Sequence, residues 1–111
     1  MAKGKSKVIA DITIFPVGVG PSVGTYVSKA FKSMKRIKHL KFSPNAMATV
    51  IEADNFGDVM AAAKSAHKTL VNMGAKRVYI ILRVDHRLDK PETAKYKIDR
   101  LMGKTAKKPK V

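Results

Sequence analysis

The fold is decided by residues 8–37, which read VIADITIFPVGVGPSVGTYVSKAFKSMKRI and change their hydrophobic period midway. Residues 8–15 alternate between two faces and are rich in β-branched side chains, which is typical of a strand. Glycine and proline then interrupt the pattern up to about Gly24. From Thr25 onward the apolar residues recur at helical spacing, with lysines on the opposite face. The stretch therefore predicts a strand, a loop and an amphipathic helix.

The rest of the chain extends this order. Residues 39–45 predict a short edge strand, limited by Pro44, and residues 47–53 predict a buried strand. A helix follows, which Asn55 can cap and Gly74 ends. The sequence then predicts a strand over 77–84 and a third helix from Pro91 to about Met102. The first six elements follow the split βαβ order of a ferredoxin-like α+β sandwich. We expect a four-stranded antiparallel sheet with both main helices on one face and a C-terminal helix after it.

The face of the sheet without helices also carries apolar residues. By the alternation of the two long strands it includes Ile9, Thr13, Phe15, Tyr79 and Ile81. A sheet that is apolar on both faces usually buries both. We therefore expect the chain to form a homo-oligomer through this face.

Positive charge dominates the composition. The 111 residues hold 23 Lys and Arg against 8 Asp and Glu, a net charge of +15. Seven of the 23 cations lie in residues 1–7 and 103–111, which lack hydrophobic periodicity. We expect these segments to be basic, flexible tails on a single domain at 8–102. Six more lie between Lys29 and Lys41, where they form either a solvated helix face or a stripe that contacts phosphates.

Composition also narrows the setting. No apolar run approaches the ~20 residues that a transmembrane helix needs, and there are no cysteines. We expect a cytoplasmic protein without membrane contact, disulfides or cysteine-bound metal.

The element order and the positive charge raise two alternatives, both of which involve nucleic acid. The RNA-recognition domain shares the order, but the strand over 47–53 has no aromatic residue for base stacking, so sequence-specific RNA binding is not expected. A basic module that binds nucleic acid or another polyanion through the first helix and the tails stays open as the alternative function.

No acid–base pair, nucleophile or histidine spacing predicts catalysis or a metal site, and the glycines at 18–24 do not fit a dinucleotide or phosphate loop.

Acidic residues gather in one place. Glu52, Asp54 and Asp58 are three of the eight acids. We expect the strands over 8–15 and 47–53 to be parallel neighbours, so that their C-terminal ends meet at one edge and place the loop over 16–24 beside Glu52. We expect a pocket there for a small ligand with an amino group or a positive charge. Its edge would consist of glycine backbone, Ser22, Thr25 and Tyr26.

Several segments in this order resemble the thiamine-binding protein family, over about residues 8–100. They are 11–18 with Ser22 and Tyr26-Val27, then 49–54, Ala66-His67, and 77–79 leading to Asp85, Arg87 and Asp89. The resemblance implies a ferredoxin-like fold, assembled as dimers and often tetramers through sheet faces and the C-terminal helix.

The same resemblance implies non-catalytic binding of thiamine or its hydroxymethylpyrimidine part, with no cofactor. Ligand contacts are then expected at Gly20, Ser22, Thr25, Thr49 and Glu52. Glu52 would accept a hydrogen bond from the aminopyrimidine, while Phe15 or Tyr26 packs against its ring.

Overall fold

The computed structural model describes residues 8–104, so most of the two expected tails, 1–7 and 105–111, lies outside the described residues. The elements are β1 (Val8–Pro16), α1 (Gly24–Lys35), β2 (Lys41–Pro44), β3 (Thr49–Ala53), α2 (Phe56–Asn72), β4 (Val78–His86) and α3 (Ala94–Leu101). This order confirms the predicted ferredoxin-like α+β fold. The strands form one antiparallel sheet in the order β2-β3-β1-β4, which places the proline-containing β2 at an edge as predicted.

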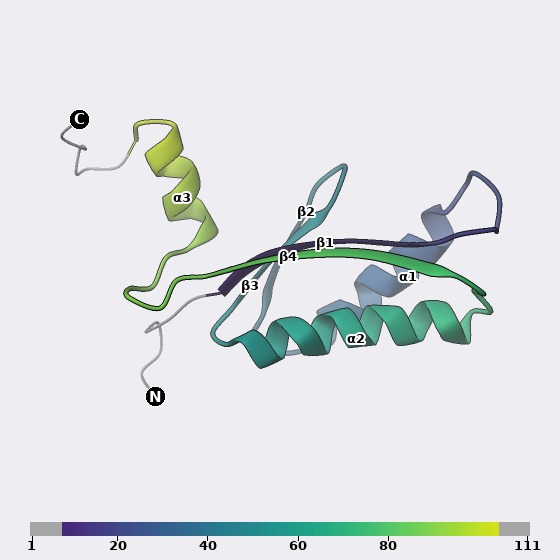
Figure 1. The fold of residues 1–111 in the computed structure, drawn as a ribbon. Coiled ribbons are helices and arrows are strands. Elements are labelled where there is room, and N and C mark those ends of the chain that lie inside the picture. Colours follow the sequence, from purple (N-terminus) through teal and green to yellow (C-terminus); the bar gives the residue numbers. More distant parts are fainter. Residues whose placement is uncertain (1–7, 105–111) are drawn as a thin grey trace.

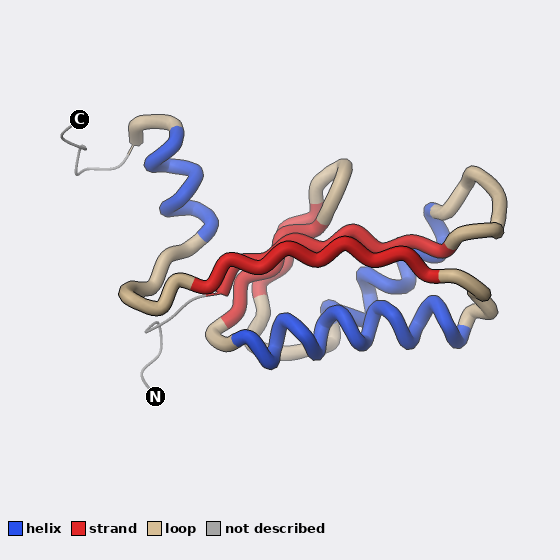
Figure 2. The backbone as a smooth tube through the Cα atoms, in the orientation of Figure 1, coloured by secondary structure: helices blue, strands red, loops and turns tan. Residues whose placement is uncertain are grey.

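The two long helices lie side by side on one face of the sheet, while α3 stands apart at one end (Figures 1 and 2). Ser65 of α2 donates hydrogen bonds to the carbonyl and hydroxyl oxygens of Ser33 of α1, at 3.3 and 3.2 Å. The helices are therefore tied to each other as well as to the sheet.

The hydrophobic core fills the space between the sheet and the two helices. Every second residue of β1, starting at Val8, is buried on the helix side, as the alternation predicts. Met34 of α1, together with Val59 and Leu70 of α2, closes the core from the other side. Among residues 8–104 neither long helix covers the opposite face of the sheet, and Tyr79 and Ile81 on it are nearly half exposed.

The direction of β3 differs from the sequence prediction. β1 and β3 are antiparallel, with Ile9 opposite Glu52 and Ile12 opposite Thr49. The parallel pairing that we predicted is wrong because β3 folds back from β2 as a hairpin, and β2 itself runs parallel to β1 after the α1 crossover. The C-terminal end of β3 therefore lies beside the start of β1, away from the loop at 17–23.

α3 begins later than predicted. The helix starts at Ala94, and the hydroxyl of Thr93 accepts a hydrogen bond from the Tyr96 amide at 3.1 Å. This side-chain cap fixes the start of the helix, so Pro91 lies in the preceding loop. None of the α3 residues is buried, and Ile98 and Leu101 are exposed.

Candidate functional site

A cavity of about 200 Å³ opens where β2 and β3 end and the sheet narrows from four strands to two. β3 pairs with β1 only up to Ile12, whereas β1 continues to Pro16 with β4 alone beside it. The turn between β2 and β3 bends toward this gap, and the Thr13 hydroxyl donates to the Met47 carbonyl at 2.9 Å. Three segments line the cavity. They are residues 12–15 of β1, the turn and strand start at 45–49, and the α1 side chains Val27, Phe31 and Met34 with Val23 just before the helix.

The lining contains no ionisable side chain. Its side-chain polar groups come from Thr13, Asn45 and Thr49, and the other lining side chains are apolar. A pocket with apolar walls and a few polar groups suits a neutral ring that carries hydrogen-bonding atoms, because burying an unpaired charge there would be costly.

The structure brings only part of the predicted site together. Phe15 and Thr49 line the cavity. Gly20, Ser22, Thr25 and Tyr26 do not line it, although Val23 and Val27 from the same segment do. Gly18 and Gly20 both have positive φ, at 94° and 97°, which accounts for glycine in this tight loop.

Glu52 lies far from this loop within one chain. Its partner Ile9 is seven residues before Pro16, roughly 23 Å away along an extended strand. The predicted pocket between the loop and Glu52 is therefore wrong for the single chain, since it depended on parallel strands.

Sequence reasoning missed the turn at 45–48, which supplies one wall of the cavity. The signal was present: two consecutive predicted strands separated by so few residues must form a hairpin, and its turn lies at the edge of β1 in this topology. The backbone N–H of Asn45 donates to the Ala48 carbonyl at 2.9 Å and closes the turn.

Glu52 instead anchors α3. Its carboxylate is buried and accepts a hydrogen bond from the Ala94 amide at 2.9 Å, at the first residue of the helix. Lys41 lies 3.9 Å from the other carboxylate oxygen. A carboxylate at a helix N-terminus satisfies a free amide and interacts favourably with the helix dipole. Glu52 therefore performs a capping role across 42 residues of sequence.

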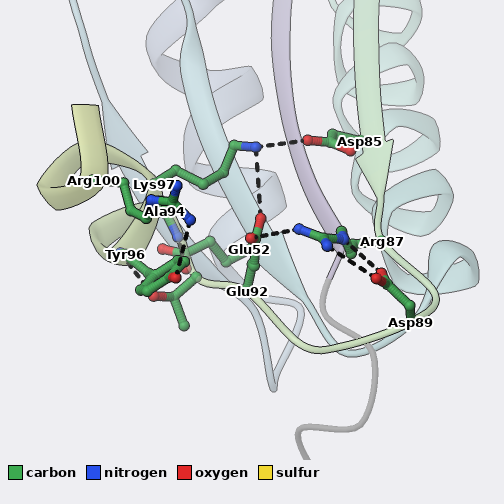
Figure 3. A network of polar contacts seen from close by, with 10 residues as sticks. Glu52, Asp85, Arg87, Asp89, Glu92, Ala94, Tyr96, Lys97 and Arg100 are labelled. Carbon is green, nitrogen blue, oxygen red and sulfur yellow. Dashed lines mark hydrogen bonds and ion pairs between the residues drawn. The ribbon is translucent and has the colours of Figure 1, made fainter. Parts of the chain in front are cut away.

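The turn after β4 forms an ion-pair network with α3 (Figure 3). Arg87 pairs with Asp89 and, at 2.8 Å, with Glu92, while Lys97 pairs with Asp85 at 2.9 Å and lies 3.8 Å from Glu92. The hydrogen bond from Arg87 lowers the pKa of Asp89, and the hydrogen bond to Asp85 raises the pKa of Lys97. These residues position α3. No group of three or more histidine or acidic side chains in residues 8–104 is arranged to hold a metal ion.

Replacing Glu52 by alanine is expected to loosen α3 while leaving the sheet intact. The Ala94 amide loses its partner and the helix loses its main link to β3. Hydrogen exchange of the α3 amides should accelerate by about tenfold or more, since a lost hydrogen bond to a charged group costs roughly 1.5–3 kcal/mol.

The matched control is Asp99→Ala, which removes an exposed ion pair within α3 and no link to the sheet. Exchange in α3 that is equally fast in both variants would show that Glu52 has no special anchoring role.

Together these features define a class of protein: a ferredoxin-like α+β domain with an uncharged cavity at a step in its sheet. Within the described part of the chain, no helix has the length and apolar character needed to cross a membrane.

The chain belongs to the thiamine-binding protein family, whose model matches residues 10–102. A Methanocaldococcus jannaschii protein named UPF0045 protein MJ1052 is 41% identical over 92 residues, covering 83% of this chain and 89% of that protein. Its crystal structure superposes with a TM-score of 0.77, covering 89% of this chain and 98% of that one, at 37% identity. A Thermotoga maritima protein provisionally assigned to thiamine biosynthesis or salvage has a TM-score of 0.72 over 86% of this chain and 98% of its own, at 20% identity, which shows the shared fold.

Proposed function

We propose that the protein binds thiamine or a related hydroxymethylpyrimidine-type molecule in the cavity at the step of the sheet, and does not transform it. Membership of the family supports the ligand class. The observation that carries the proposal is the lining of the cavity, which is apolar with three neutral polar side chains. An aminopyrimidine is a neutral aromatic ring with donors and acceptors on its edge, so it matches this lining.

Volume and charge favour the pyrimidine part of the ligand. The cavity of about 200 Å³ is smaller than the roughly 300–1,000 Å³ of pockets that enclose drug-sized ligands. One ring fits inside, and a cationic thiazolium would extend toward solvent. Phe15 and Thr49 are the predicted contacts that line the cavity. We retain Gly20, Ser22, Thr25 and Tyr26 as proposed contacts for the part of the ligand that extends outside.

Titration calorimetry with hydroxymethylpyrimidine and with thiamine tests this proposal. We expect both to bind, with the pyrimidine retaining most of the affinity because only its ring is enclosed. The ligands should be recovered unchanged after incubation. Absence of heat from both ligands, with the protein folded, would overturn the proposal.

We also propose that the protein is a homodimer or homotetramer that uses the open face of the sheet and α3. The apolar part of this face contains Phe15 and Tyr79, whose rings are 5.4 Å apart, next to Ile81. Tyr79 is 48% exposed and Ile81 is 46% exposed, which is costly for a face that meets only water. On α3, Ile98 and Leu101 are also exposed and could join the same interface.

Replacing Ile81 by glutamate is expected to convert the oligomer to monomers, because a charge at the centre of an apolar interface has no partner. Analytical ultracentrifugation measures the mass. The control is Val71→Glu, which adds the same charge at a similarly exposed position on α2, outside the sheet. A monomeric wild-type protein, or an Ile81→Glu variant of unchanged mass, would contradict the proposed interface.

A further inference from the structure

Charge is unevenly distributed over the molecule. Between Asp11 and Glu52 the sequence has no acidic residue. Most acids form ion pairs at the sheet and α3: Asp11 with Arg83, Asp85 with Lys97, Asp89 and Glu92 with Arg87, and Asp99 with Lys95. These acids therefore neutralise cations of the sheet, the loop after β4 and α3, and within residues 8–104 no ion pair involves a cation of α1 or α2.

Five of these cations form one surface, which we call the basic helix face: Lys29, Lys32 and Arg36 from α1 and its C-cap, and Lys64 and Lys68 from α2. All five are exposed. Within residues 8–104 no acidic side chain pairs with any of them.

Helical periodicity places these residues together. Lys29, Lys32 and Arg36 follow i, i+3, i+7 spacing, and Lys64 and Lys68 follow i, i+4 spacing, so each set lies on one helix face. The sheet-facing sides of the helices are fixed by buried residues such as Ala30 and Ala66. The Ser33–Ser65 hydrogen bonds fix the sides on which the helices meet. Both sets of cations therefore lie on the outer side of the helix pair, next to the line along which the helices touch.

We propose that the basic helix face binds the phosphate backbone of duplex nucleic acid without reading its sequence. Two packed helices hold the cations at fixed separations, and the α1 set spans about 10 Å along its axis. Regularly spaced phosphates of a rigid duplex suit such an array, and release of their counterions would drive binding. This binding is independent of the small-molecule cavity, which is lined by the sheet side of α1.

Other anionic partners fit this surface less well. An interfacial membrane helix inserts an apolar face beside its cations, but the apolar face of α1 is packed in the core through Ala30 and Met34. Binding of single strands relies on aromatic platforms for the bases. Tyr26 and Phe31 of α1 pack against the core instead. Phosphate contacts alone fix no sequence, so binding should not depend on base composition.

The test compares two full-length variants of equal charge. In the first, all five residues of the basic helix face are replaced by glutamine, which is a good helix former. In the second, the same replacement is made at Lys3, Lys5, Lys7, Lys108 and Lys110. Each change lowers the net charge from +15 by 5, to +10. Fluorescence anisotropy with a mixed-sequence duplex DNA then measures the dissociation constant as a function of salt concentration.

With one phosphate contact per cation, the slope of log K against log salt should become less steep by about 4.5 in the helix-face variant. Raising the salt from roughly 50 to 200 mM should therefore weaken DNA binding about 500-fold less in the helix-face variant than in the wild type. The tail variant should lose much less of the slope. A single-stranded DNA of the same length should bind more weakly than the duplex.

Circular dichroism confirms that the variants fold. If the fivefold variant does not, Lys32→Gln with Lys64→Gln should still lower the slope by about 1.8. Equal losses in the helix-face and tail variants would overturn the proposal, since only bulk charge would then matter. Tighter binding to phosphatidylserine vesicles than to duplex DNA, lost in the helix-face variant, would make a membrane the partner and also overturn it.

Discussion

Replacing Leu70 by alanine is expected to lower the free energy of unfolding by about 2–5 kcal/mol. Leu70 is fully buried in α2, where it packs into the core between this helix and the sheet. Truncation removes apolar contact area and leaves a cavity that the tightly packed strands and helices fill only partly. For a domain of this size, such a loss is a large fraction of the total stability.

The matched control is Leu101→Ala, the same chemical change at a position that is 84% exposed on α3. The free energy of unfolding of this variant should lie within about 0.5 kcal/mol of the wild-type value. Urea unfolding followed by circular dichroism gives both values. Similar losses for the two variants would mean that Leu70 is not part of the core, and the position of α2 on the sheet would have to be revised.

The second large effect is expected at the cavity, where Ala48→Phe should weaken binding of hydroxymethylpyrimidine by more than tenfold, or about 1.4 kcal/mol. Ala48 lies in the wall formed by the β2–β3 turn. A phenyl group there would occupy much of the roughly 200 Å³ that the ligand ring needs. The fold should persist, because the new side chain enters existing space rather than a filled core.

Ala61→Phe provides the control, since Ala61 is exposed on α2 and does not line the cavity. It should bind the ligand as the wild type does. Titration calorimetry measures the affinity of both variants for hydroxymethylpyrimidine. Unchanged affinity in a folded Ala48→Phe variant would move the site away from this cavity, even if the wild-type protein binds thiamine.

Local patterns were sufficient to predict most of the fold. The alternation from Val8 to Phe15 assigned the two faces of β1 correctly, and the β4 register places Tyr79 and Ile81 on the open face as predicted. Asn55 caps α2 as its position indicates, accepting a hydrogen bond from the Asp58 amide at 2.8 Å. These features depend on residues within one or two turns of each other, so the sequence displays them directly.

The candidate site was predicted less well because it depends on contacts between distant segments. Phe15 and Thr49, which the family resemblance implied as ligand contacts, line one cavity at the end of the β1–β3 pairing, whereas Glu52 lies opposite Ile9 near the other end of β1. The local sequence around Glu52 shows a carboxylate on a strand, and nothing nearby indicates that its partner is the Ala94 amide.

The sequence by itself therefore determined the order of the elements, the face on which each apolar residue lies and the excess of positive charge. Only the tertiary structure decided that β3 runs antiparallel to β1, that the sheet has a step lined by the turn at 45–48, and that Asp11, Asp85, Asp89, Glu92 and Asp99 pair with cations outside α1 and α2. The physical reason is range: periodicity and capping act between near neighbours, whereas strand direction, cavities and charge pairing follow from how the connections bring distant segments together.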